Sequence, residues 1–191
     1  MPDHFIITVF VINALWLAWM TLWFILAFRA KKTVYRQPWS QRILYLLLGI
    51  SAYFIMRWGH GLNLWSLPRS PATEAAGIVV CAAGMAWTVW ARFTLGRNWS
   101  GLITLKENHE LITSGPYRMT RHPIYTGMII AVAGTMLALV PSVRGIFCWA
   151  VIATAFTIKL LQEEKLMLRQ FPEAYPAYKA GVRARLIPFI W

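Results

Sequence analysis

Long apolar runs separated by short polar segments dominate the sequence. A helix that crosses a lipid bilayer needs about 20 mostly apolar residues. Five stretches approach this length: Phe5–Phe28, Ile43–Met56, Ala72–Ala91, Ile124–Val140 and Gly145–Leu161. The pattern therefore predicts an all-α integral membrane protein with about five transmembrane helices.

The connections between these stretches predict how the chain is organised. A short segment that begins at Pro141 separates the fourth stretch from the fifth, which predicts a helical hairpin. The first stretch has no basic segment before it and no small-residue cleavage site after it, so we expect a retained helix rather than a signal peptide. We expect one membrane domain over residues 1–191, with three spans in 1–91 and a core with a polar loop, the hairpin and a tail in 92–191.

Basic residues are distributed unevenly between the connections. The chain has 19 Lys and Arg against 7 Asp and Glu. The segments Arg29–Arg42, Arg92–Arg121 and Lys159–Arg185 hold five, five and six of the 19. Because cytoplasmic loops carry the excess of Lys and Arg, these segments predict an outside N-terminus and a cytoplasmic C-terminus. Topology and attraction to anionic head groups account for the charge, so we expect no nucleic-acid partner.

Composition excludes several other classes of protein. With 58% hydrophobic and 14% charged residues, the chain is neither a soluble globule nor a disordered chain. The two Cys and four His lack the spacing of metal ligands, so we expect no metal site. A small transporter or scaffold is the non-enzymatic alternative. It would need charges or broken helices at mid-membrane depth, where Lys159 is the nearest case.

The loop from Arg92 to His122 leads directly into the fourth span. Its alternating residues 101–105 favour a short strand, and Pro123 suits the first turn of a helix. The free backbone N–H groups of that turn lie beside Arg118, Arg121 and His122. We therefore expect an anion-binding corner at the water boundary.

The tail continues the fifth span out of the membrane. Glu163 and Glu164 follow Lys159 by about one helical turn and lie about 100° apart around the helix, so they cannot both point the same way. Ionisable groups at the edge of a membrane bundle are candidates for a functional site. Pro172 and Pro176 then end the helix and fold the chain back.

These polar segments together match a known pattern. The matching residues are His109, Leu111, Gly115, Pro116, Tyr117, Arg121, His122, Pro123, Tyr125, Gly127, Glu163, Glu164, Phe171, Tyr175, Tyr178 and Pro188. In this order and spacing they closely resemble the isoprenylcysteine carboxyl methyltransferase family and its relatives among the phospholipid methyltransferases. The resemblance covers about 80 residues, from Lys106 to Pro188, and the short chain resembles the compact prokaryotic members.

The resemblance implies an integral membrane enzyme that uses S-adenosyl-L-methionine. The cofactor-binding residues that it implies are His109, Leu111, Gly115, Tyr117, Arg121, His122, Tyr125, Glu163 and Glu164. The chemistry agrees, because Arg121 and His122 suit the carboxylate of the cofactor, and the two glutamates suit its ammonium or ribose hydroxyls. Catalytic roles fall to Arg169, as the cation that steers the substrate, and to Glu164.

The expected reaction is carboxyl O-methylation of a lipophilic, isoprenoid-type acid, with the active site facing the cytoplasm. Trp16, Trp19, Trp23, Tyr53 and Phe54 offer an apolar lining for the acid. The compact size makes a protein substrate doubtful. Two other reactions stay open: N-methylation of an amino or phospholipid head group, for which Glu164 would act as base, and the chemistry of the more distant sterol reductases.

Overall fold

The computed structural model describes residues 3–36, 38–62, 64–100, 104–106 and 110–187. Each of the five apolar stretches forms a helix, and a sixth helix lies in the tail. The helices are α1 (Asp3–Ala27), α2 (Trp39–Trp58), α3 (Pro71–Leu95), α4 (Pro123–Leu139), α5 (Val143–Gln170) and α6 (Ala174–Gly181). Short 3₁₀ turns occupy Gly59–Leu62, Gly96–Asn98 and Gly115–Arg118.

Four of these helices are long and apolar enough to cross a membrane. They are α1, α2 with the turn that follows it, α3 with the turn that follows it, and α5. The fourth apolar stretch forms α4, which has only 17 residues and is shorter than the others. The all-helical membrane architecture is thereby confirmed, while the number of spans and their orientation stay predictions.

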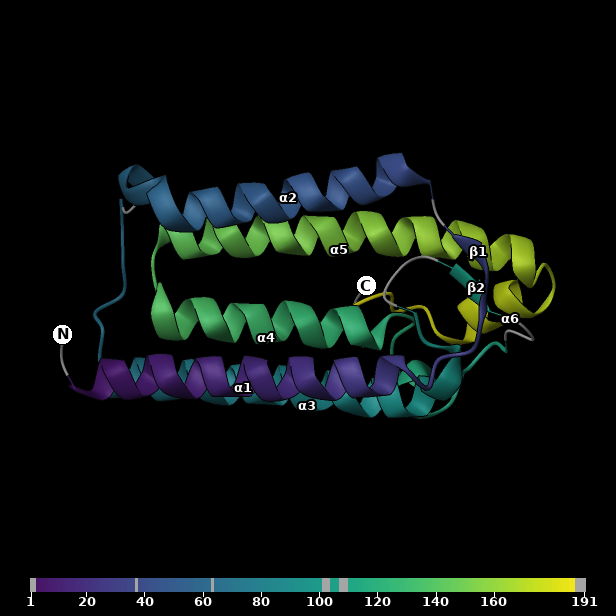
Figure 1. Ribbon diagram of the computed structural model, residues 1–191, viewed down its shortest axis with the longest axis horizontal. Helices are drawn as coiled ribbons and strands as arrows, with labels where there is room; N and C mark the ends of the chain where they lie inside the picture. The colour runs from purple at the N-terminus through teal and green to yellow at the C-terminus, as the bar shows by residue number, and fades with distance from the viewer. Residues whose placement is uncertain (1–2, 37, 63, 101–103, 107–109, 188–191) are drawn as a thin grey trace.

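The helices run side by side, and the polar segments gather at one end of the bundle (Figure 1). In this view α2 lies on α5, α4 lies between α5 and the pair α1 and α3, and α6 lies beside the end of α5 that extends past the other long helices. A small antiparallel sheet at the same end pairs β1 (Thr33–Arg36) with β2 (Thr104–Lys106). Part of the predicted strand over residues 101–105 lies outside the described residues, and its remainder belongs to β2. The sheet joins the connection between α1 and α2 to the loop that precedes α4.

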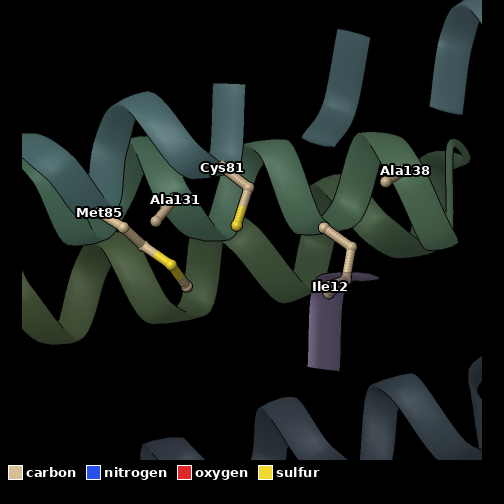
Figure 2. Close-up of a cluster of buried hydrophobic side chains, with 5 residues drawn as sticks. All are labelled: Ile12, Cys81, Met85, Ala131 and Ala138. Atoms are coloured by element: carbon tan, nitrogen blue, oxygen red, sulfur yellow. The ribbon is translucent and has the colours of Figure 1, made fainter. Parts of the chain in front are cut away.

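Glycines bring α3 and α4 unusually close together. A Cβ atom on Gly84 of α3 would lie 2.5 Å from the backbone nitrogen of Ala131, and one on Gly134 of α4 would lie 2.2 Å from that of Cys81. Small residues at such contacts allow the close backbone approach on which helix packing in membranes depends. Figure 2 shows the apolar cluster at this contact, to which α1 contributes Ile12.

Two tryptophans attach α1 to this helix pair by hydrogen bonds. Trp16 Nε1 donates to Thr135 Oγ1 on α4 at 3.0 Å, and Trp19 Nε1 donates to Thr88 Oγ1 on α3 at 2.7 Å. Water does not compete for these groups inside a bilayer, so both partners depend on the contact. The three helices form a fixed wall for the cavity described next.

Candidate active site

A cavity of about 360 Å³ is lined by residues from several segments at the polar end of the bundle. One part of its lining is apolar: Trp19, Trp23, Leu95, Trp99, Met128 and Phe156. Another part carries charge or hydrogen-bonding groups: Arg121, His122, Tyr125, Lys159, Glu163 and Tyr178. Acidic, basic and apolar groups therefore share one cavity.

Glu163 is the acidic residue that α5 contributes to the cavity. Tyr125 Oη donates to its Oε2 at 2.6 Å, and His122 Nδ1 lies 3.8 Å from the same oxygen. The rings of His122 and Tyr125 are stacked, with centroids 5.6 Å apart. Lys159, one turn earlier on α5, places its Nζ 5.4 Å from the centre of the Tyr125 ring. The start of α4 and this part of α5 thus form one charged group of side chains.

The neighbouring Glu164 does not line the cavity but contacts two residues that do, Arg121 and His122. Its side chain is buried and is absent from the lining, and its Oε1 accepts a hydrogen bond from Arg121 Nε at 2.7 Å. Its Oε2 lies 3.5 Å from Arg185 Nε and 3.8 Å from Lys179 Nζ. Glu164 therefore links the start of α4, α5 and the tail, and its contact with a cofactor stays a prediction.

The tail packs against the residues that immediately precede α4. The backbone N–H of Arg121 donates to Ala184 O at 2.9 Å, and that of His122 donates to Arg185 O at 3.1 Å. The Arg121 side chain also donates, through Nη1, to Val182 O at 2.6 Å and to Arg183 O at 2.7 Å. The tail carbonyls therefore satisfy the two N–H groups that immediately precede α4, while anion binding by the first turn of α4 itself stays a prediction.

The structure brings together six of the nine residues expected to hold the cofactor. Those that line the cavity are Leu111, Tyr117, Arg121, His122, Tyr125 and Glu163. Gly115 has a φ of +57°, and a Cβ there would lie 3.0 Å from Thr94 Oγ1, so it shapes the turn instead. His109 lies outside the described residues.

Arg169, the residue expected to steer the substrate, does not reach the cavity. Its side chain is exposed in the last turn of α5 and is not part of the lining. Lys159 on the same helix does line the cavity. Its spacing of four residues from Glu163 places the two on one helical face, a signal that was available in the sequence. Trp99, which follows α3, also lines the cavity and carried no such signal.

Three phenols lie around the polar part of the site: Tyr117 and Tyr175 are buried, and Tyr178 is half-buried. Burial, followed by the negative charge of Glu163, raises the pKa of Tyr117 well above its usual value. Burial likewise raises the pKa values of Tyr175 and Tyr178. These groups therefore stay neutral at physiological pH, and Tyr178 Oη donates to Tyr117 O at 2.7 Å. This hydrogen bond fixes α6 against the turn that precedes α4.

Comparisons with known proteins give a consistent result. The model of the isoprenylcysteine carboxyl methyltransferase family matches residues 76–169, which run from α3 to the end of α5. Protein-S-isoprenylcysteine O-methyltransferase A of Arabidopsis thaliana is 31% identical over 116 residues, or 60% of this chain and 58% of that protein. The Rattus norvegicus protein-S-isoprenylcysteine O-methyltransferase is 31% identical over 119 residues, or 61% and 42%. The nickel-cobalt-cadmium resistance protein NccN of Alcaligenes xylosoxydans xylosoxydans is 35% identical over 85 residues, or 42% and 38%.

A solved structure shares the fold. The eukaryotic intramembrane Ras methyltransferase ICMT superimposes with a TM-score of 0.57 and 24% identity, covering 81% of this chain and 54% of that one. The chain thus matches about half of the length of these relatives.

Proposed function

We propose that this chain, which matches the model of the isoprenylcysteine carboxyl methyltransferase family over residues 76–169, is a member of that family and an S-adenosylmethionine-dependent carboxyl O-methyltransferase. Its substrate is a lipophilic, isoprenoid-type acid. The observation that carries the proposal is the composition of the cavity, where a carboxylate, basic groups and aromatic rings lie beside an apolar wall. Such a site accommodates a zwitterionic cofactor and an amphipathic acid together.

The side chains of the cavity fit the charges of the cofactor. Glu163 suits the ammonium or the ribose hydroxyls of the cofactor. His122, whose Nδ1 lies 3.8 Å from Glu163 Oε2, lines the same cavity and suits the cofactor carboxylate. The aromatic faces of Tyr125 and Tyr117 suit a neighbouring sulfonium. When bound, the cofactor supplies a methyl group on a sulfonium, an activated leaving group for in-line transfer to a carboxylate oxygen.

Lys159 takes the steering role that the sequence assigned to Arg169. It lies on α5 between Phe156, which belongs to the apolar wall, and Glu163, which belongs to the polar part. A substrate with an apolar tail would place its carboxylate at this boundary, because burying an unpaired charge deeper is costly. A carboxylate nucleophile needs orientation in a dry site rather than a base. Lys159 therefore orients the carboxylate and needs no proton transfer.

N-methylation of an amino head group is disfavoured by the position of Glu164. An ammonium must lose a proton before it can attack, and Glu164 was the expected base. Its carboxylate instead pairs with Arg121, Arg185 and Lys179, and Glu164 itself is absent from the cavity lining. Carboxyl methylation requires no such group, so it fits the arrangement better.

A protein substrate belongs within the proposal. Only the compact size of the chain raised doubt about such a substrate. The names of several relatives, protein-S-isoprenylcysteine O-methyltransferases, do not support that doubt. We therefore extend the substrate class to an S-isoprenylcysteine carboxylate, whether free or at the end of a polypeptide. The polar cofactor enters from the cytoplasm, where the basic segments lie, and the lipophilic acid enters from the bilayer.

Calorimetry with the purified protein in detergent tests cofactor binding. We expect saturable binding of S-adenosylmethionine that weakens in Glu163→Gln. Loss of a charge-assisted hydrogen bond costs about 1.5–3 kcal/mol, or roughly 10–150-fold in affinity. Lys165→Gln is the matched control, since Lys165 is exposed on the same helix and absent from the lining. Failure of the unaltered protein to bind the cofactor would overturn the proposal.

A further inference from the structure

A second hollow lies where α1 and α3 end, and none of its lining residues belongs to the active-site cavity. It has a volume of about 550 Å³. Its lining includes three arginines, Arg29, Arg92 and Arg97, and two phenylalanines, Phe28 and Phe93. We call it the arginine groove. Both helices end here on the side of the molecule that also carries the loop and the tail (Figure 1).

Two of the arginines have no acidic partner among the described residues. Neither Arg29 nor Arg97 takes part in an ion pair there, and the groove lining contains no Asp or Glu. The backbone holds the two segments together, because the N–H of Lys31 donates to Arg97 O at 2.9 Å. Two cations on different segments are thereby kept on one surface without a counter-charge from this part of the protein.

The third arginine, Arg92, neutralises the partial negative charge of two helix ends that would otherwise repel an anion. The carbonyl ends of α1 and α3 carry partial negative charge. Arg92 is 2% exposed, and its guanidinium donates to Leu26 O at 2.7 Å and to Gly96 O at 2.6 Å. The buried cation thus compensates both helix ends, and every charged side chain in the groove lining is basic.

The aromatic residues place this positive site beside lipid. Phe28 is 76% exposed and Phe93 is 58% exposed, and both lie at the ends of helices that are long and apolar enough to span the membrane. Cations adjacent to exposed apolar rings at this depth match a molecule with a phosphate above and acyl chains below. We propose that the arginine groove binds the phosphate head group of an anionic glycerophospholipid.

The groove also contacts the wall of the active site. Arg92 lines the groove, and its guanidinium carbon lies 4.5 Å from the centre of the Trp99 ring. Trp99 lines the active-site cavity and packs edge-to-face against Trp23, with ring centroids 6.2 Å apart. Arg92 therefore connects the groove to the apolar wall of the active-site cavity.

Lipid binding can be measured without reference to catalysis. Native mass spectrometry of the full chain in detergent, titrated with phosphatidylglycerol or phosphatidylcholine, gives the affinity for each lipid. We expect the protein to bind phosphatidylglycerol selectively. The double variant Arg29→Gln, Arg97→Gln should bind it about 30-fold more weakly, because each basic residue near a membrane surface contributes about 1 kcal/mol. The control is Lys165→Gln, Arg183→Gln, which removes the same charge from exposed side chains outside the groove and should bind normally.

Several results would overturn the proposal. One is equal affinity for the two lipids, and another is unchanged affinity in the groove variant. A third is an equal loss of affinity in the control variant, because that result would indicate diffuse attraction between the basic protein and the anionic lipid. Displacement of the lipid by soluble glycerol phosphate at similar concentration would show that the groove binds free phosphate instead. If circular dichroism shows loss of helix in the double variant, the single variants provide the test, each with about a fivefold loss expected.

Discussion

The replacement Glu164→Gln should release the C-terminal tail and leave the membrane helices folded. Glu164 is 4% exposed, and its carboxylate meets the Arg121 side chain at 2.7 Å and Arg185 at 3.5 Å. Removal of one partner from a buried ion pair costs about 3–5 kcal/mol, because the other charge is left without compensation. Gln retains an acceptor for Arg121, so we expect the lower end, about 3 kcal/mol. The open form of the tail should then be populated roughly 150-fold more.

Limited proteolysis with trypsin measures this opening. Cleavage after Arg183 and Arg185 requires the tail to leave α4, since the carbonyl oxygens of both residues accept hydrogen bonds from the start of that helix. When opening is fast relative to cleavage, the cleavage rate follows the population of the open form. Glu163→Gln is the matched control. Glu163 is the neighbour of Glu164 in the sequence, but it lines the cavity and makes no described ion pair with the tail. Cleavage of Glu164→Gln at the unaltered rate, or equal acceleration in Glu163→Gln, would refute the assignment of Glu164 to the tail.

Three further predictions concern the site and its support. Lys159→Met should raise KM for the acid while cofactor affinity changes little, and Lys159→Arg should restore part of the loss; steady-state kinetics and calorimetry separate the two effects. Tyr125→Phe removes the 2.6 Å hydrogen bond to the cavity carboxylate and should weaken cofactor binding about 3–10-fold in the same calorimetric assay. Gly84→Ala should destabilise the protein by about 1–3 kcal/mol, because the added Cβ would lie 2.5 Å from the backbone nitrogen of Ala131. Gly49→Ala is the control and should not destabilise it, because nothing lies within 4 Å of a Cβ at that position. Unfolding in detergent measures both changes.

Much of the membrane architecture followed from the length of the apolar stretches alone. Each of the five stretches forms a helix, because a chain in lipid must satisfy its backbone groups internally. The position of α2 against α5, and of α1 against α3 and α4, was not predictable in the same way. The contact of α3 with α4 depends on glycines that lie opposite each other, and α1 is attached by tryptophans that bind hydroxyl groups far along the chain. The contact of α2 with α5 includes a hydrogen bond from Tyr45 Oη to Gln162 Oε1 at 2.6 Å, which joins residues equally far apart in the sequence.

The candidate site was predicted in composition but not in detail. Residues around Arg121 and His122 do meet Glu163 in one cavity, as the family resemblance implied. The helical angle between Glu163 and Glu164 showed that they must diverge, but the direction of each depends on where the tail packs. The tail pairs with α4 over about 60 residues of sequence separation, as the hydrogen bonds from Arg121 to Val182 and Arg183 show. Local patterns contain no information on such a contact.

The function proposed here is tested most directly by the chemistry of the methylated product. Purified protein in lipid vesicles would be incubated with S-adenosylmethionine labelled in its methyl group and with N-acetyl-S-farnesylcysteine, a short isoprenoid acid or phosphatidylethanolamine. Carboxyl methylation predicts label in one of the two acids as a methyl ester, which releases volatile methanol in base, with turnover reduced in Lys159→Met. Label found only in phosphatidylethanolamine, as a base-stable N-methyl group, would contradict the assignment.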